Sequence, residues 1–140
     1  MSNQGLEVID QTVHLTHEWI NELAERVGYS SKRSALRLLR TVLQILRDRV
    51  PQDEMAQFSA QLPLLVRGVM FEGWQPKLVP KTALVFQKHV ITEMQDTSEF
   101  RGPEDTKYVF DLLNARISRG EVEDMRACLP QDIRAYWTAP

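Results

Sequence analysis

The chain repeats part of its own sequence at a fixed offset of 67 residues, and this repeat constrains the fold more than any other feature. Identical residues stand at matched positions in both segments. The identical pairs include Val42/Val109, Leu46/Leu113, Arg49/Arg116, Glu54/Glu121, Ala60/Ala127, Leu62/Leu129, Pro63/Pro130 and Arg67/Arg134. An ungapped register of this kind predicts two copies of one supersecondary unit. We expect copy one at about 14–74 and copy two at about 81–137, inside a single domain spanning 1–140.

Apolar residues recur at helical spacing along most of the chain. Trp19, Leu23 and Val27 mark one helix, and Gly28 follows where a helix end favours a left-handed residue. Ser30 or Ser31 is the expected N-cap of the longest helix, whose apolar stripe is wide enough for a central position. The longest helix is expected over 32–50. The other expected helices cover 51–61, 64–70, 81–95, a segment that begins at Pro103, 121–128 after Gly120, and 130–137. Since alternation of period two is rare, the expected fold class is all-α: two tandem copies of a roughly four-helix unit packed into one compact helical bundle domain.

The composition is that of a globular chain. Hydrophobic residues make up 43% and charged residues 26% of the sequence, and the net charge of −2 gives no overall bias toward nucleic acid. No apolar run approaches the ~20 residues of a membrane helix, and the N-terminus lacks a basic segment followed by an apolar one. The single cysteine, Cys128, excludes an intramolecular disulfide and favours a reducing compartment. We therefore expect a cytoplasmic protein with no membrane partner.

Three segments carry a family resemblance. They are 35–39 (ALRLL) running into 46–51 (LRDRVP), then 61–68 (QLPLLVRG), and then 71–74 (FEGW). Together they resemble the DUF2267 family, a group of bacterial proteins with no assigned function, and the similarity extends over about 19–137. The resemblance implies a duplicated all-helical fold and a bacterial source. It implies no catalytic residues, because none are established for the family.

Four arginines of the expected helix over 32–50 form the main candidate for a binding surface. They are Arg33, Arg37, Arg40 and Arg47. On a helix these positions share one narrow stripe opposite the apolar face, and such a stripe could contact phosphates. The alternative is a solvated face, paired with acidic residues of the other copy. The second copy favours this alternative, because Phe100 and Glu104 stand where Arg33 and Arg37 would recur.

Histidines offer a weak candidate for a metal site. His14 and His17 are three residues apart, so they could face one way on a helix and bind a metal through imidazole nitrogens. Glu18 or His89 could complete the ligand set. The alternative, which we favour, is that these are ordinary histidines near a frayed helix start, so no metal is expected.

Phe71 and Trp74 are the aromatic candidates for partner binding. Large aromatics beside a glycine in a connection can anchor a partner, since such residues dominate interface energies. Sealing the core is the favoured role for both. Trp137 aligns with Met70 at the offset of the repeat, and we expect it to pack as Met70 does.

The charged residues that match between the copies allow two interpretations. Arg49/Arg116, Glu54/Glu121 and Arg67/Arg134 could line a cleft between the copies, where arginine would grip carboxylates or phosphates. Alternatively they cap helices and form ion pairs within a copy. The second interpretation is favoured, because Glu54 near a helix start and Arg49 at the preceding helix end suit it.

No nucleophile, base and oxyanion donors can be assembled from the sequence, so we expect no enzyme activity and no cofactor. The leading functional hypothesis is a non-catalytic helical interaction or regulatory module of a bacterial cytoplasm, whose partner is a protein and which could form a homodimer. An exposed apolar patch near Trp74 or the first helix would support it. The alternatives are nucleic-acid binding through the arginine stripe, and small-ligand or metal binding between the two copies.

Overall fold

The computed structural model describes residues 5–76 and 85–140, and within these ranges the chain is helical and has no strand. The helices are α1 (Glu7–Val27), α2 (Lys32–Arg47), α3 (Gln52–Ser59), α4 (Leu64–Phe71), α5 (Phe86–Met94), α6 (Thr106–Arg116), α7 (Arg119–Cys128) and α8 (Gln131–Arg134). A short 3-10 helix, η1 (Pro103–Asp105), leads into α6. The all-α prediction is confirmed.

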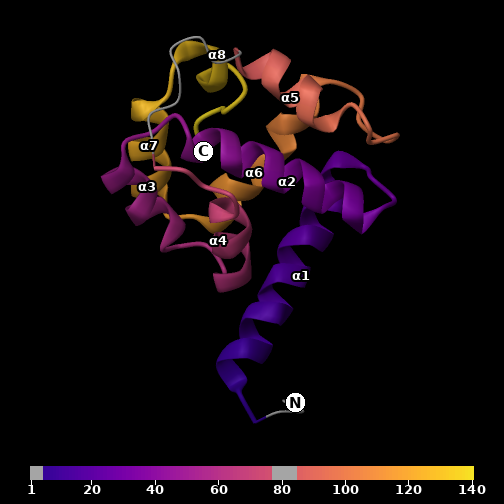
Figure 1. Cartoon of the computed structure of the whole chain (residues 1–140), viewed down its shortest axis with the longest axis vertical. Helices are drawn as coiled ribbons and strands as arrows, with labels where there is room; N and C mark the ends of the chain where they lie inside the picture. Colours follow the sequence, from indigo (N-terminus) through magenta and orange to yellow (C-terminus); the bar gives the residue numbers. More distant parts are fainter. Residues whose placement is uncertain (1–4, 77–84) are drawn as a thin grey trace.

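Helix α2 lies at the centre of the fold, and α1, α4, α5 and α6 pack around it (Figure 1). It begins after Ser31, whose side chain accepts a hydrogen bond from the backbone nitrogen of Ser34 at 3.2 Å, so the predicted N-cap is confirmed. Nine of its sixteen residues are buried, which is more than one face of a surface helix would bury. A single hydrophobic core, to which α1 to α8 all contribute, surrounds this helix.

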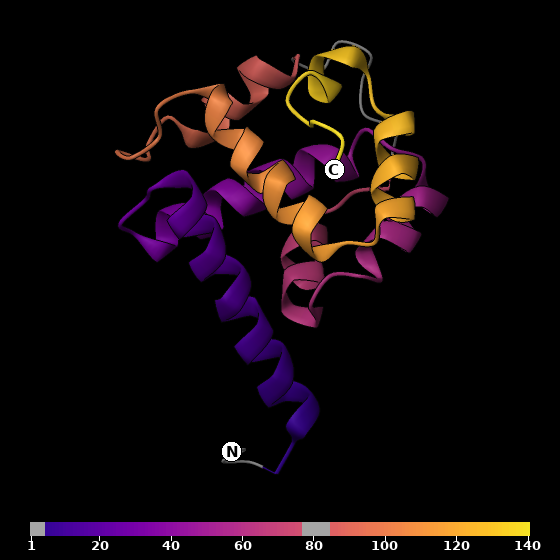
Figure 2. The same cartoon turned by 180° about the vertical axis from the view of Figure 1, so that it is seen from behind.

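Helix α1 has two different halves. Its C-terminal half packs on α2 and α6, and it ends at Gly28, which adopts the left-handed conformation (φ 79°) that the sequence predicted. Its N-terminal half projects away from the other helices in both views (Figures 1 and 2). The amphipathic pattern of α1 therefore continues beyond the part of the helix that the core covers.

Several predicted boundaries are wrong. Helix α2 ends at Arg47 instead of residue 50, and Pro103 opens a 3-10 turn instead of an α-helix. Gly120 lies inside α7 instead of before it, and α8 ends at Arg134 instead of about Trp137. Turn residues 48–49 and 135–136 follow α2 and α8, so both helices end earlier than predicted. The expected start of the helix at 81 and of copy two falls outside the described residues.

Helices at the offset of the repeat occupy related places in the fold. Helix α3 starts at residue 52 and α7 at residue 119, and α4 starts at residue 64 and α8 at residue 131. Helix α1 packs on α6 and α5 packs on α2, while α3 and α7 pack on each other. The α3–α7 contact therefore brings equivalent sequence positions close together.

Candidate functional site

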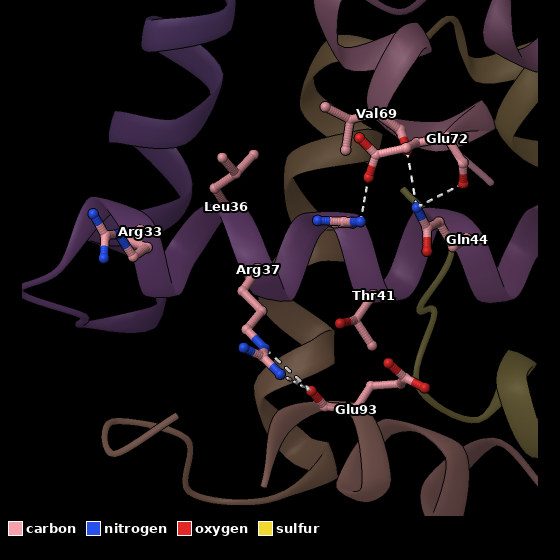
Figure 3. Close-up of a pocket in the computed structure, with 9 residues that line it drawn as sticks. Arg33, Leu36, Arg37, Thr41, Gln44, Val69, Glu72 and Glu93 are labelled. Carbon is pink, nitrogen blue, oxygen red and sulfur yellow. Dashed lines mark hydrogen bonds and ion pairs between the residues drawn. The ribbon is translucent and has the colours of Figure 1, made fainter. Parts of the chain in front are cut away.

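A groove of about 580 Å³ runs along the outer side of α2 and brings together three of the four candidate arginines (Figure 3). The α2 side of this arginine groove carries Arg33, Leu36, Arg37, Arg40, Thr41 and Gln44. Val69 and Glu72 close one side from α4 and the turn after it, and Glu93 closes the other from α5. The arginine stripe is therefore the wall of a groove between three elements.

Two of the three arginines in the arginine groove already pair with groups of the protein itself. The Arg37 guanidinium donates to the Glu93 carbonyl oxygen at 3.0 Å and lies 4.0 Å from the Asp96 carboxylate, while Arg40 pairs with Glu72. Arg33 makes no hydrogen bond or ion pair with the residues that the structure describes. The groove thus combines one unengaged cation with carboxylates of its own, which weakens the field that a phosphate would feel.

Arg47 is a correction to the predicted stripe. Its side chain is only 9% exposed and does not face solvent. The guanidinium donates to the carbonyl oxygens of Met70 at 2.9 Å and Glu72 at 3.1 Å and to the Asp48 carboxylate at 2.8 Å. Because the end of α4 returns over the end of α2, Arg47 satisfies carbonyl groups that the α4 terminus leaves open.

Phe71 and Trp74 are half-buried, and they pack against each other edge to face with ring centroids 5.5 Å apart. Both also pack against the hydrophobic core. The core-sealing role that the sequence favoured agrees with this placement. Trp137 is fully buried, as its counterpart Met70 is, so that prediction is confirmed.

The structure does not bring the candidate histidines together. His14 and His17 are exposed on the projecting half of α1, where His14 lies 3.8 Å from the Glu18 carboxylate. His89 is on α5, with its Nδ1 atom 3.3 Å from an Arg49 nitrogen. Burial and then the charge of Arg49 lower the pKa of His89. The set His14, His17, His89 therefore forms no common ligand site.

The projecting half of α1 presents a row of large apolar side chains to solvent. Together with two leucines at the start of α4 they form a surface that we call the α1–α4 apolar patch. Its members are Leu6, Val8, Ile9, Val13, Leu15, Leu64 and Leu65, and they are between 38% and 64% exposed. The two parts are adjacent, because the backbone nitrogen of Leu65 donates to the Thr12 hydroxyl at 3.0 Å.

A carboxylate cluster lies where α3 packs on α7. One carboxylate oxygen of Glu54, one of Glu121 and one of Asp124 lie within 4.8 Å of one another. Glu121 is only 8% exposed, and its Oε2 atom and that of Glu54 are buried without a hydrogen-bond partner. Burial, followed by the neighbouring Glu54, raises the pKa of Glu121 to about 8. Sequence reasoning missed this cluster, although Glu54 and Glu121 match at the repeat offset.

The other matched charges separate into different roles. Arg67 donates to the carbonyl oxygens of Ser59 and Ala60, which terminates α3 as the structural interpretation predicted. Arg116 instead pairs with Glu22 of α1 at 2.7 Å, so it links the two halves of the chain and is not an ion pair within a copy. Glu54 and Glu121 likewise meet across the halves, which corrects the expectation that they act inside each copy.

Cys128, at the end of α7, is exposed. Partial burial and then the carboxylates of Glu54 and Asp53 raise the pKa of its thiol. A raised pKa disfavours the thiolate that a nucleophile requires. The carboxylates around Cys128 therefore make its thiol a poor nucleophile.

The raised pKa of Glu121 predicts how stability depends on pH. Because the folded state holds a proton on Glu121 that the unfolded chain releases above its ordinary pKa of 4.5, stability should fall as pH rises from 4.5 to about 8. Glu121→Gln removes this loss, so the variant should exceed the wild type by about 1 kcal/mol at pH 8 and match it near pH 4. Urea unfolding in a chelating buffer measures the difference. Glu123→Gln, on the exposed side of α7, is the control, and equal pH dependence in both variants would contradict the prediction.

Comparison with known proteins identifies the family. Residues 16–136 match the family model described as an uncharacterized conserved protein (DUF2267). A search of curated proteins finds no match. Within the described ranges no helix has the length and apolarity needed to cross a membrane. The arginine groove and the carboxylate cluster lie inside the matched segment, and since that segment covers most of the chain, the protein belongs to the DUF2267 family.

Proposed function

We propose that this protein is a non-catalytic helical interaction module that associates with a second copy of itself through the α1–α4 apolar patch. The observation that carries the proposal is the exposure of this patch on a helix that projects from the body of the fold (Figure 2). Single apolar residues are common on protein surfaces, but seven exposed apolar side chains gathered on the first helix and the adjoining start of α4 favour an interaction site. The sequence hypothesis named an apolar patch on the first helix as its support.

The apolar side chains of the projecting segment continue the buried face of α1. Positions 6, 9 and 13 follow the spacing that leads to Ile20 and Val27, and positions 8 and 15 lead to Trp19 and Leu23. Further along the helix this same face is covered by α2 and α6. A face with this pattern is typical of a helix that packs against other helices. In the projecting half the start of α4 covers part of this face at Thr12, while the apolar residues of the patch stay exposed.

The polar residues beside the patch favour an antiparallel second copy. Asp10 and His17 are seven residues apart, about two turns, so they lie on the same edge of the apolar stripe. In an antiparallel pair, equivalent edges of the two helices face each other. Asp10 of one copy would then accept a hydrogen bond from His17 of its partner, and the pairing is reciprocal, as a twofold interface requires.

The oligomeric state tests this proposal. Ile9→Glu/Val13→Glu places two charges in the centre of the patch, and we expect it to convert a dimer into a monomer, because each buried unpaired carboxylate costs several kcal/mol. Sedimentation velocity across a dilution series, with circular dichroism to verify helix content, measures the change. His14→Glu is the matched control, since the His14 side chain is 76% exposed and its neighbours one turn away on the same helix are polar.

Three outcomes decide the proposal. A wild-type and His14→Glu dimer with a monomeric double variant would support it. A dimer that survives in the double variant would place the interface elsewhere. A wild type that stays monomeric at all concentrations would overturn self-association and leave the patch for a different protein.

The internal repeat supports the rest of the proposed description. We propose that copies one and two arose by duplication of a four-helix unit and share one domain, which the paired starts of α3 with α7 and α4 with α8 favour. A bacterial cytoplasm is the proposed location, on the basis of the family resemblance and the single cysteine. Nucleic-acid binding is the weaker alternative, because Glu72 and Glu93 line the same groove as Arg33 and Arg37.

A further inference from the structure

The contact between α3 and α7 buries acidic groups that have no basic partner among residues 5–76 and 85–140. Glu54 and Glu121 approach each other there, with Asp124 at the solvent side. Among the described residues, no lysine, arginine or histidine forms an ion pair with any of the three. Buried carboxylates are normally paired or bound to a metal, because removing a charge from water is costly. The described part of the chain therefore supplies no positive charge to match these carboxylates.

The Glu121 carboxylate lacks the hydrogen-bond partner that its place near the start of α7 predicts, and it faces the cluster instead. Residues 118–121 (SRGE) have the sequence of a capping box, in which the glutamate would accept from the Ser118 backbone nitrogen. Only half of the box forms: the Ser118 hydroxyl accepts from the Glu121 nitrogen at 3.3 Å, whereas the Ser118 nitrogen donates to Gln61 Oε1 at 2.8 Å. Gln61 thus takes the place of Glu121, and the Glu121 carboxylate is left to face Glu54.

Glu54 is deprived of the same partner by a different cause. It occupies the equivalent position near the start of α3, but the residue before that helix is Pro51, which has no backbone N–H to donate. Both glutamates are therefore released from their helix ends and directed at each other. Their buried Oε2 atoms remain without a hydrogen-bond partner, and Glu121 is more than nine-tenths buried.

We propose that Glu54, Glu121 and Asp124 bind a hard divalent cation of the size of Ca²⁺. Oxygens on opposite sides of a Ca²⁺ ion are separated by about 4.6–5.2 Å, twice the usual Ca–O distance, which accommodates the observed limit of 4.8 Å. All three ligands are carboxylates, the donors that such cations prefer, and the nearby Cys128 thiol is not among them. Asp124 is exposed, so waters complete the coordination from the solvent side.

The cation would join the two halves of the chain. Glu54 belongs to α3, and Glu121 and Asp124 belong to α7, so a bound ion bridges helices that pack on each other. It would also neutralise the carboxylates that otherwise repel one another across this contact. The expected effect is a Ca²⁺-dependent gain in resistance to unfolding, independent of any association through the α1–α4 apolar patch.

Calorimetric titration of the chelator-treated full chain with CaCl₂ at about pH 8 tests the proposal, with thermal unfolding as a second readout. We expect one Ca²⁺ per chain with a Kd of about 10⁻⁴–10⁻³ M, as in open-sided sites. Glu121→Gln and Glu54→Gln should each lose at least tenfold in affinity. Both replacements keep the size of the side chain, so they should fold. Glu123→Gln, on α7 but paired with Arg119 at 3.1 Å, is the control and should bind as the wild type does.

Other results would overturn the proposal. Absence of both heat and thermal shift with Ca²⁺, Mg²⁺ and Mn²⁺ in the wild type would show that a shared proton alone holds the two glutamates. Binding that persists unchanged in Glu121→Gln and Glu54→Gln would place the ion elsewhere. Binding of Zn²⁺ alone, lost on Cys128→Ser, would replace the hard-cation site by a thiolate site.

Discussion

Asp105→Ala is expected to lower the free energy of unfolding by about 3 kcal/mol, since it leaves the buried Tyr29 hydroxyl and the part-buried Arg101 backbone nitrogen without an acceptor. Asp105 is 3% exposed and lies in η1, at the entrance to α6. Its Oδ2 atom accepts from the Tyr29 hydroxyl at 2.7 Å and from the Arg101 backbone nitrogen at 3.0 Å. The carboxylate therefore connects the end of α1 to the loop before α6, which are 76 residues apart in the chain.

The ion pair with Arg101 contributes less than these hydrogen bonds. The guanidinium lies 3.2 Å from Asp105 Oδ1, but the Arg101 side chain is mostly exposed, and surface pairs add at most about 1 kcal/mol. Burial and then the hydrogen bond to Asp105 raise the pKa of Tyr29 far above its ordinary value, so the hydroxyl remains a donor throughout the working pH range. The loss in Asp105→Ala should accordingly change little with salt.

Urea unfolding followed by circular dichroism measures this loss, and a double-mutant cycle assigns it. Tyr29→Phe alone should cost about 1 kcal/mol, because it removes the donor and leaves Asp105 with its other partners. In the Asp105→Ala background the same change should cost less, because the hydroxyl has already lost its acceptor. Equal costs in both backgrounds would show that the 2.7 Å contact carries no stability.

Helix positions were readily predicted because they depend on local spacing. The broad apolar stripe of α2 indicated a central helix, and the structure surrounds it with four others. The N-cap Ser31 and the C-terminal Gly28 were equally readable, because each acts on its own helix end. Predicted ends failed where the chain reverses, since the reversal depends on contacts with other helices.

The candidate site was predicted less well, because helix periodicity gives the side of a helix but not what covers that side. Arg33, Arg37 and Arg40 do share a groove, whereas Arg47 shares their stripe and is buried by the returning end of α4. The carboxylate cluster depends on a competition that the sequence does not reveal. The Ser118 nitrogen donates to Gln61, so it is not available to the Glu121 carboxylate, which lies close to Glu54.

Trp137→Ala is expected to cost about 3–5 kcal/mol, the range for removing a buried tryptophan. Trp137 is 0% exposed and stacks on Phe110 of α6, with ring centroids 4.8 Å apart. Its indole nitrogen donates to Asn114 Oδ1 at 2.8 Å, and its carbonyl oxygen accepts from Arg126 of α7 at 2.8 Å. The residue therefore attaches the segment after α8 to both α6 and α7, and its loss opens a cavity at that junction.

Trp74→Ala is the matched control, since Trp74 is only half-buried and packs edge to face on Phe71. We expect it to cost about 1–2 kcal/mol, in line with partial burial. Trp137→Phe distinguishes the contribution of buried area to stability from that of the hydrogen bond. It keeps an aromatic ring against Phe110 but loses the bond to Asn114, so its cost should fall between those of the two alanine variants. Urea unfolding of all three measures the order. If Trp137→Ala cost no more than Trp74→Ala, the C-terminal segment would unfold separately from the core, and the burial of Trp137 would not contribute to global stability.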